Sequence, residues 1–312
     1  MRAFAAFVAA ITLALLIGAC VAYPAYWLVG GIGHWAFHRV AERVAMLVLA
    51  GELVWLCRRL DLRTRADFGF GLPRRRFIAQ ALIWGVVGIA TAALGAAFLL
   101  GAHLRAIAPG FTPSAGSIAR IFLAGVASGI AVALIEETVM RGAMQTAIER
   151  ESGPWAGALL TAPVFAVLHF FAKASIPHDE LAWRSGFVLL SRSFVPLSHP
   201  SAVLDSFLSW LTVGLILSMT RILTGNNAVG IGLHACWVVV LRMLQLATVR
   251  DSATLSSVWV GRFDGILGYW VLPWGFAIAV ALWITRAFWV PPASSRAAAA
   301  PVLANRRSRR CS

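Results

Sequence analysis

The sequence predicts an all-α, polytopic membrane protein with about eight transmembrane helices. Of its 312 residues, 60% are hydrophobic and only 13% are charged, and the mean hydropathy is +0.79. Soluble proteins contain about 25% charged residues and about 45–50% apolar ones. This difference excludes a soluble domain, a disordered chain and a disulfide-stapled secreted scaffold. It indicates that most of the chain crosses lipid.

Eight apolar stretches approach or exceed the length needed to span a bilayer, which is about 20 residues. In chain order they are Ala3–Leu28, Val40–Cys57, Phe77–Leu100, Ile118–Met140, Trp155–Phe171, Val203–Leu223, Ala228–Ala247 and Ile266–Val290. The second stretch is the weakest, because Glu42, Arg43 and Glu52 interrupt it. We expect one transmembrane domain over residues 1–290 and a basic, disordered cytoplasmic tail over residues 291–312.

The arginines predict the orientation of the chain. The connection Arg58–Arg76 and the tail are both rich in arginine, and positive residues flanking membrane spans favour the cytoplasmic side. Six stretches separate the two segments, so both termini are expected in the cytoplasm together with the turn Glu149–Pro154. The segment Lys173–Pro200 then lies on the opposite side, either along the interface or re-entering the bilayer.

The composition also indicates the setting of the protein. The formal net charge is +14, and the basic residues cluster between and after the apolar stretches. This placement suits binding to anionic lipid headgroups rather than to nucleic acid. The chain has one lysine against 26 arginines, since Lys173 is the only lysine among 27 basic residues. That ratio is typical of GC-rich bacterial genomes, so a multi-pass protein of a bacterial inner membrane is expected.

Ionisable residues inside apolar stretches are costly in lipid and are therefore candidates for function. The fourth stretch contains Glu136, Glu137 and Arg141, the fifth ends near His169, and the seventh contains His234. In an α-helix, Glu137 and Arg141 have the spacing of an ion pair with the acid first. Glu136 lies about 100° around the helix and has no such partner within the motif.

The fourth and fifth stretches are also expected to match in depth. They join at the turn signal Ser152-Gly153-Pro154. Glu136 lies 16 residues before Ser152, and His169 lies 16 residues after Gly153. In an antiparallel hairpin, this places the carboxylate and the imidazole at the same level in the membrane.

A glutamate with two histidines can activate water for hydrolysis. Glu136, His169 and His234 could instead hold Zn²⁺ with one open position, although the sequence contains no His-Glu-x-x-His. Two non-hydrolytic interpretations stay open. One is a structural ion-pair network, and the other is a proton-coupled transporter. The absence of a detectable repeat between the two halves of the sequence argues against the transporter.

The motifs resemble those of the CAAX prenyl endopeptidase and bacteriocin-processing intramembrane proteases, also called the type II CAAX protease or self-immunity family. The pattern EExxxR matches Glu136-Glu137-Thr-Val-Met-Arg141, and FxxxH matches Phe165-Ala-Val-Leu-His169. The third pattern, HxxxN or HxxxD, matches only at His234, because Val238 stands at its last position. The resemblance covers about residues 118–240.

The resemblance implies a membrane endopeptidase with a catalytic cavity open to the cytoplasm and a peptide or membrane-protein substrate. Glu136 would be the base that activates water, His169 a catalytic partner, and His234 a group that holds the water or the tetrahedral intermediate. Glu137, Arg141 and Phe165 would support the site. Metal-free catalysis without a cofactor is the preferred interpretation, and a zinc enzyme is the alternative.

Val238 leaves the expected site without its usual amide. The resemblance implies that an asparagine or aspartate there assists the reaction, and valine offers no polar group. Asn227, two helical turns before His234, is a candidate replacement for the donor. A catalytically inactive immunity or scaffold protein is therefore a further alternative.

Overall fold

The computed structural model describes residues 1–29, 35–170, 175–251, 258–261 and 263–290. The helices in these ranges are α1 (Arg2–Val29), α2 (Phe37–Arg59), α3 (Arg74–Gly101), α4 (Ala115–Glu136), α5 (Thr146–Ser152), α6 (Pro154–Leu168), α7 (Ser185–Ser193), α8 (Pro200–Thr224), α9 (Ala228–Ala247) and α10 (Val271–Trp289). The chain also forms a π-helix, η1 (Glu137–Gln145), and two 3₁₀ turns, η2 (His178–Glu180) and η3 (Val195–Ser198). The strands β1 (Arg105–Ile107) and β2 (Thr248–Arg250) pair antiparallel.

The all-α membrane class is confirmed. Each of the eight predicted stretches contains a helix, and six helical segments of the described chain are long and apolar enough to cross a bilayer. The two exceptions are α2, which charged residues interrupt, and α6, which is a shorter apolar helix. The predicted tail, residues 291–312, lies outside the described residues.

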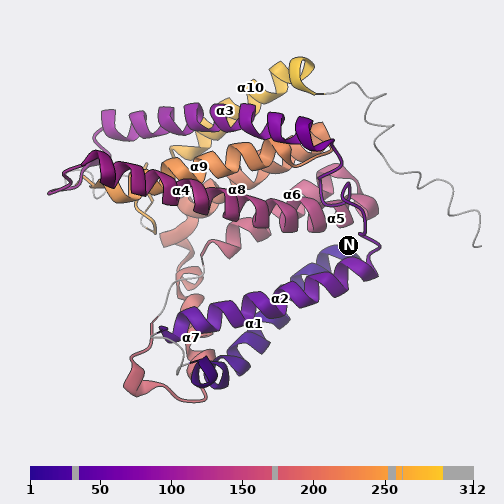
Figure 1. The fold of residues 1–312 in the computed structure, drawn as a ribbon, viewed down its shortest axis with the longest axis vertical. Coiled ribbons are helices and arrows are strands. Elements are labelled where there is room, and N and C mark those ends of the chain that lie inside the picture. The colour runs from indigo at the N-terminus through magenta and orange to yellow at the C-terminus, as the bar shows by residue number, and fades with distance from the viewer. Residues whose placement is uncertain (30–34, 171–174, 252–257, 262, 291–312) are drawn as a thin grey trace, which may run out of the picture.

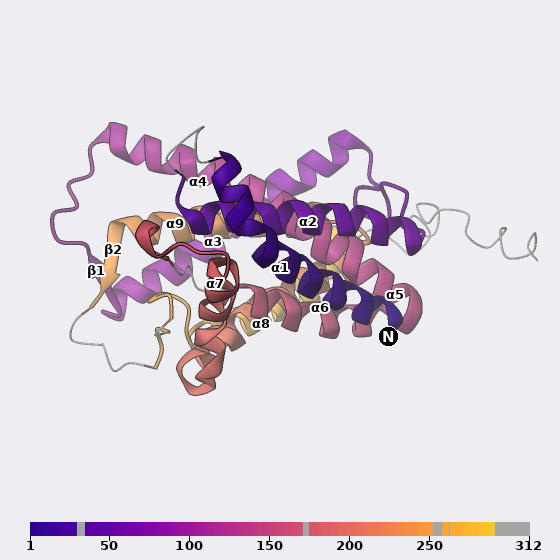
Figure 2. The same ribbon diagram turned by 90° about the horizontal axis from the view of Figure 1, so that it is seen from below.

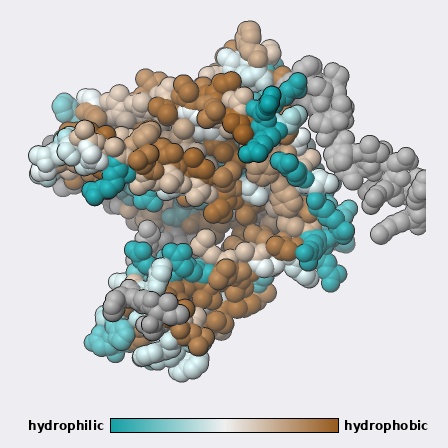
Figure 3. Space-filling view, in the orientation of Figure 1, coloured by the Kyte–Doolittle hydropathy of each residue, from teal (hydrophilic) through white to brown (hydrophobic). Residues whose placement is uncertain are grey.

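The helices form two groups, as Figure 1 shows. The larger group contains α3, α4, α6, α8, α9 and α10, and the smaller group contains α1, α2 and α7. In Figure 3, hydrophobic residues cover much of the visible face of both groups, and hydrophilic residues gather toward their ends. This distribution suits a bundle whose lateral surface faces lipid.

Glycines let the central helix α9 approach its neighbours closely. A Cβ atom built on Gly232 would lie 2.3 Å from the carbonyl oxygen of Ala81 on α3. A Cβ atom on Gly129 of α4 would lie 2.5 Å from the carbonyl oxygen of Ala235 on α9. Small residues at helix crossings have this role in membranes, where packing drives association.

The two ends of the larger group carry different segments of the chain, and Figure 2 shows β1 and β2 at one end and the N-terminus near α5 toward the other. We call one end the arginine end, because it carries the connection between α2 and α3, the N-terminus and the turn at Gly153. There the terminal amine of Met1 lies 2.7 Å from Glu151 Oε2. We call the other end the ribbon end, because it carries the β1–β2 pair.

The segment after α6 lies on the ribbon side of the smaller group. Its helix α7 packs against α1 so tightly that a Cβ atom on Gly186 would lie 1.9 Å from the carbonyl oxygen of Ala19. Residues 171–174, which include Lys173, lie outside the described residues. In its described part, the segment that the sequence left unplaced contains the short helix α7, which packs on α1, and the turns η2 and η3.

The packing of α9 predicts that Gly232→Ala destabilises the protein. The new methyl group would meet the backbone oxygen of Ala81, and overpacking of this kind costs about 1–3 kcal/mol. Thermal unfolding of the purified protein in detergent measures the effect. Gly51→Ala on α2 is the matched control, because its Cβ would meet nothing within 4 Å. Equal stability of the two variants would contradict the prediction.

Candidate active site

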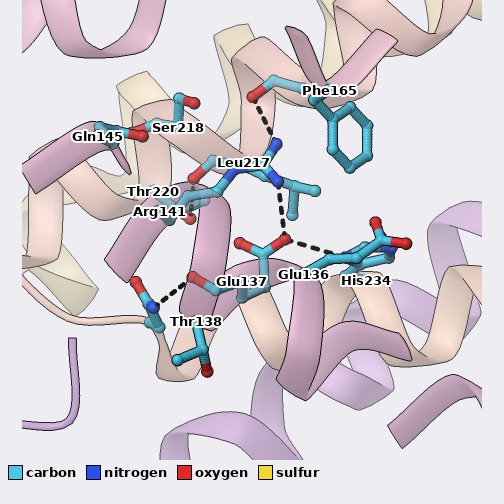
Figure 4. A network of polar contacts seen from close by, with 12 residues as sticks. Glu136, Glu137, Thr138, Arg141, Gln145, Phe165, Leu217, Ser218, Thr220 and His234 are labelled. Carbon is cyan, nitrogen blue, oxygen red and sulfur yellow. Dashed lines mark hydrogen bonds and ion pairs between the residues drawn. The ribbon is translucent and has the colours of Figure 1, made fainter. Parts of the chain in front are cut away.

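A buried carboxylate, Glu137, connects two other buried side chains. Its Oε1 atom accepts a hydrogen bond from Arg141 Nη1 at 3.1 Å and lies 2.9 Å from His234 Nδ1. The three residues are at most 3% exposed, and Figure 4 shows Glu137 between the other two. Because an ionised carboxylate only accepts hydrogen bonds, His234 carries a proton on Nδ1.

Arg141 contacts two neighbouring helices. Its Nη2 donates to the carbonyl oxygen of Gly214 on α8 at 3.1 Å, and its guanidinium lies 4.4 Å from the centre of the Phe165 ring on α6. A buried arginine needs such contacts, since an unpaired charge in a dry interior is very costly. Arg141 thus ties α6 and α8 to the helix that carries both glutamates.

The helix changes its winding at the glutamates. It is α-helical through Glu136 and becomes a π-helix over Glu137–Gln145. The predicted ion pair of Glu137 with Arg141 is present, and Glu136 takes no part in it. The α-helical geometry assumed from the sequence was nevertheless wrong beyond Glu136. π-Helical turns are rare and are frequent at functional sites.

Glu136 faces His234 from the neighbouring helix. Its Oε2 atom lies 3.8 Å from His234 Nε2, which is too far for a hydrogen bond. The described residues offer this oxygen no hydrogen-bond partner, although the atom is buried. The pair is therefore placed to bind a small molecule such as water between or beside the two groups.

His169 ends α6 and lies against aromatic rings. Its Nδ1 atom is 2.7 Å from the carbonyl oxygen of Phe165, so Nδ1 carries the proton and Nε2 is left as an acceptor. The ring stacks on Trp210 of α8, with centroids 3.8 Å apart and planes at 22°. Phe165 also contacts His169, at 4.5 Å between ring centres. These contacts hold the imidazole in one orientation.

Glu136, His169 and His234 line one cavity of about 430 Å³. Its volume lies within the range of small-molecule sites, about 300–1,000 Å³. Apolar and aromatic residues form most of the wall, including Trp210, Trp237, Trp270 and Trp274. The structure thus brings the three side chains to one space, as the equal distances from the turn suggest.

The tryptophans are the part of the cavity that the sequence did not indicate. Trp210 contacts His169 directly, and Trp237 donates from Nε1 to Thr91 Oγ1 at 3.0 Å. Tryptophan is frequent at membrane interfaces for reasons unrelated to catalysis. No spacing in the sequence distinguishes these residues from interfacial ones, so only the packing identifies them.

Val238 and Asn227 occupy very different places. Val238 lines the cavity one helical turn after His234. The Asn227 side-chain amide instead donates to the carbonyl oxygens of Phe68 at 3.0 Å and Glu137 at 2.9 Å. Asn227 is not among the residues that line the cavity. The idea that its amide replaces the one expected at position 238 is therefore at odds with the structure, because both amide hydrogens are used elsewhere.

Glu136, His169 and His234 are also the side chains that the sequence gives as possible zinc ligands. Among the described residues, no three His, Cys, Asp or Glu side chains lie together as a metal site requires. Each histidine of the cavity already directs Nδ1 at an oxygen of the chain. The Nε2 atoms and Glu136 are left as the possible ligands, since a histidine that binds a metal through one ring nitrogen usually donates from the other to an oxygen of the protein.

The direction in which the cavity extends was not expected. Besides the three polar residues, it is lined by Leu241, Arg242 and Gln245, which follow His234 along α9 toward the ribbon end. The resemblance implies a cavity open to the cytoplasm, and the arginines imply a cytoplasmic arginine end. In the structure, the cavity extends from Glu136 away from the connection Arg58–Arg76, and which end faces the cytoplasm stays a prediction.

The segment between α2 and α3 packs against the arginine end of the site. Its Gly69 carbonyl accepts from the backbone of Asn227 at 2.9 Å, and a Cβ on Gly69 would overlap the Asn227 side chain. The carbonyl oxygen of Phe68 would lie 2.8 Å from a Cβ on Gly142 of η1. The loop between α2 and α3 thus contacts the backbone of both η1 and the residue that precedes α9.

Comparison with known proteins agrees with the motifs. Residues 118–240 match the family model described as type II CAAX prenyl endopeptidase Rce1-like. Curated proteins and solved structures gave no significant match to this chain. The matched residues run from α4 to the part of α9 that carries His234, so they contain the first two motifs and the histidine of the third. Over residues 118–240, this chain is therefore similar to the Rce1-like type II CAAX prenyl endopeptidases.

Proposed function

We propose that this chain hydrolyses a peptide bond within the membrane, with water that Glu136 activates and two histidines orient. The observation that supports this most directly is the shared cavity, in which Glu136 and His234 lie 3.8 Å apart and His169 faces the same space. A site that excludes most water strengthens the interactions of a carboxylate with the reacting groups.

Glu136 takes the role of the base. Its buried Oε2 atom has no hydrogen-bond partner among the described residues, so it can accept a hydrogen from water. The resulting hydroxide adds to the carbonyl carbon of the peptide, and Glu136 holds the proton. When the carbon–nitrogen bond breaks, that proton passes to the leaving amine, and the glutamate returns to its starting state.

The two histidines hold the reacting groups. The proton of His234 is on Nδ1, against Glu137, so Nε2 can accept the second hydrogen of the water. His169 offers its Nε2 atom as another acceptor, because Nδ1 is directed at the Phe165 carbonyl. Positioning of this kind contributes to rate because the reacting atoms start close to their final geometry.

Glu137 and Arg141 take supporting roles. Neither lines the cavity, so neither is expected to contact the substrate. Glu137 orients His234, and Arg141 fixes the position of the Glu137 carboxylate through their ion pair. Phe165 contacts both Arg141 and His169 and thereby connects the ion pair to the second histidine.

The first prediction from this mechanism concerns the base. Glu136→Gln keeps the size of the side chain but removes its ability to take a proton, and general bases contribute about 10²–10⁴-fold to rates. We expect at least a 10²-fold loss of peptide cleavage, measured by mass spectrometry on a library of membrane-inserted peptides. Glu180→Gln, in an exposed turn, is the control.

The amount of each variant in the membrane must be measured alongside cleavage. Glu136 makes no hydrogen bond within the described residues through its buried oxygen, so Glu136→Gln is expected to accumulate normally. Wild-type cleavage by Glu136→Gln would refute the assignment. No cleavage by the unaltered protein on any peptide would favour the inactive alternative.

The second prediction concerns metal. Because the described residues contain no group of three His, Cys, Asp or Glu side chains close enough to hold a metal ion, we expect hydrolysis to persist in protein prepared without metal and assayed with a strong chelator. The same preparation assayed with added Zn²⁺ is the comparison. Loss of activity with the chelator, restored by Zn²⁺, would overturn the metal-free mechanism and favour zinc-bound water.

The third prediction concerns Val238. No polar side chain is present at that position of the cavity wall, and a single donor to the developing oxyanion is worth about 10²–10³-fold in kcat in a well-built site. We expect Val238→Asn to raise kcat, with about 10²-fold as the upper bound. Val238→Leu controls for the change in size. An unchanged kcat would mean that another group already stabilises the oxyanion.

A further inference from the structure

A second cavity lies between α2 and η1, and none of its lining residues lines the cavity at Glu136. Ala50, Leu53 and Val54 line it from α2, and Thr138 and Val139 line it from η1. Its volume is about 620 Å³, within the range of about 300–1,000 Å³ that is typical of small-molecule sites. We call this cavity the α2 groove.

The α2 groove follows one face of its helix. Leu53, Val54 and Cys57 come three, four and seven residues after Ala50, so the four side chains share that face, and Arg58 stands at its end. From Ala50 to Arg58 the helix rises about 12 Å. One leaflet of a bilayer contains about 15 Å of hydrocarbon, half of the total of about 30 Å. The apolar part of the groove therefore has nearly the depth of one leaflet.

The charge in the α2 groove is positive and lies at one end. Arg58 is exposed, and its side chain makes no hydrogen bond or ion pair within the described part of the chain. Arg63 Nε lies 2.9 Å from Asp61 Oδ1, and both of these side chains are exposed. No acidic residue is among the described residues that line the groove. Guanidinium groups suit phosphate, which they bind through paired hydrogen bonds.

The shape and charge of the groove together indicate a lipid rather than a soluble anion. Arginines at the end of an apolar helix reach the level of the lipid headgroups. A soluble phosphate could contact Arg58 and Arg63 but would leave the apolar walls uncovered. An anionic phospholipid carries both a phosphate for the arginines and an acyl chain for the walls. The groove therefore fits this class of ligand as a whole.

The α2 groove lies between the two groups of helices. Among the described residues, α2 packs extensively against α1 of its own group and has no comparable contact with the larger group, as the separation in Figure 1 suggests. Thr138, Val139 and Ala143 of η1 form the opposite side of the groove. An acyl chain in this space would contact both groups.

The groove also adjoins segments that hold the candidate active site. Thr138 and Val139 directly follow Glu137 in η1. Phe68 lines the groove, and its carbonyl oxygen accepts a hydrogen bond from the Asn227 amide, which also donates to the carbonyl oxygen of Glu137. A ligand in the groove would therefore support the backbone around Glu137.

We propose that the α2 groove binds an anionic phospholipid, with one acyl chain along α2 and the phosphate at Arg58 and Arg63. The bound lipid joins α2 to η1 and stabilises the arrangement of the two helix groups. The proposal does not depend on the reaction that the cavity at Glu136 carries out.

Lipid binding to the full chain, purified in an uncharged detergent, tests the proposal. The dissociation constant of phosphatidylglycerol is measured by titration, and the thermal unfolding midpoint is measured with and without the lipid. Phosphatidylcholine with the same acyl chains is the comparison. We expect phosphatidylglycerol to bind more tightly and to raise the midpoint further, because a ligand of the folded state stabilises it. Equal binding and equal shifts for the two lipids would overturn the proposal.

A pair of charge variants shows whether the groove or the basic surface as a whole binds the lipid. Arg58→Gln with Arg63→Gln removes both cations of the groove. Arg59→Gln with Arg65→Gln removes the same charge from the same part of the chain but outside the groove, and the Arg59 guanidinium lies 5.2 Å from the centre of the Trp55 ring. We expect the first variant to raise the dissociation constant of phosphatidylglycerol at least about tenfold and the second to change it much less. Equal losses of affinity would overturn the assignment to the groove.

A third variant tests the position of the acyl chain. Ala50→Phe places a ring in the groove, and Leu47→Phe is the control, because Leu47 is 74% exposed and lies outside the groove. The unfolding midpoint without added lipid shows whether each variant is folded. We expect Ala50→Phe to weaken phosphatidylglycerol binding and to reduce the stabilisation by the lipid. Unchanged binding would place the acyl chain elsewhere and would contradict the proposal.

Discussion

The Glu137 carboxylate is the interaction on which the rest of the site depends. It accepts from a buried arginine and contacts a buried histidine, each from a different place in the chain. Removing one partner of such a buried pair typically costs about 3–5 kcal/mol, because the other charge is left unpaired. That constraint holds η1, α8 and α9 in one arrangement, and it sets the proton of His234 on the nitrogen that faces away from Glu136.

Two adjacent glutamates therefore have separate uses. Glu137 is enclosed and satisfied, whereas Glu136 projects into the cavity with an oxygen that lacks a partner among the described residues. The chain changes from an α-helix to a π-helix directly after Glu136. The two helix types place successive side chains at different angles around the axis, so the change helps to direct Glu136 and Glu137 to different surroundings. The arrangement accounts for how one short motif can supply both a structural ion pair and a group available for chemistry.

The cavity changes in character along its length. Its inner end is polar at Glu136 and His234, its wall is largely aromatic and aliphatic, and its far end is polar again at Arg242, Gln245 and Asp264. An apolar middle section suits a substrate with apolar side chains next to the cleaved bond, and the far end suits polar groups.

Much of this protein was determined by its sequence alone. Composition and the lengths of the apolar stretches predict a membrane bundle, because lipid admits few other structures, and the spacing of Glu137 and Arg141 predicts their ion pair. The turn at Gly153 predicts that Glu136 and His169 lie at one level. These features depend on local periodicity and chain length, which a sequence carries directly.

Other features were decided by tertiary structure. The stacking of His169 on Trp210, the use of the Asn227 amide by two backbone carbonyls, and the opening of the cavity toward the ribbon end all involve helices far apart in the chain. The π-helix belongs with them, because its winding coincides with contacts to α8, α9 and the loop at Phe68. Such contacts depend on how helices pack against one another, and the residues that make them have no distinguishing pattern along the sequence.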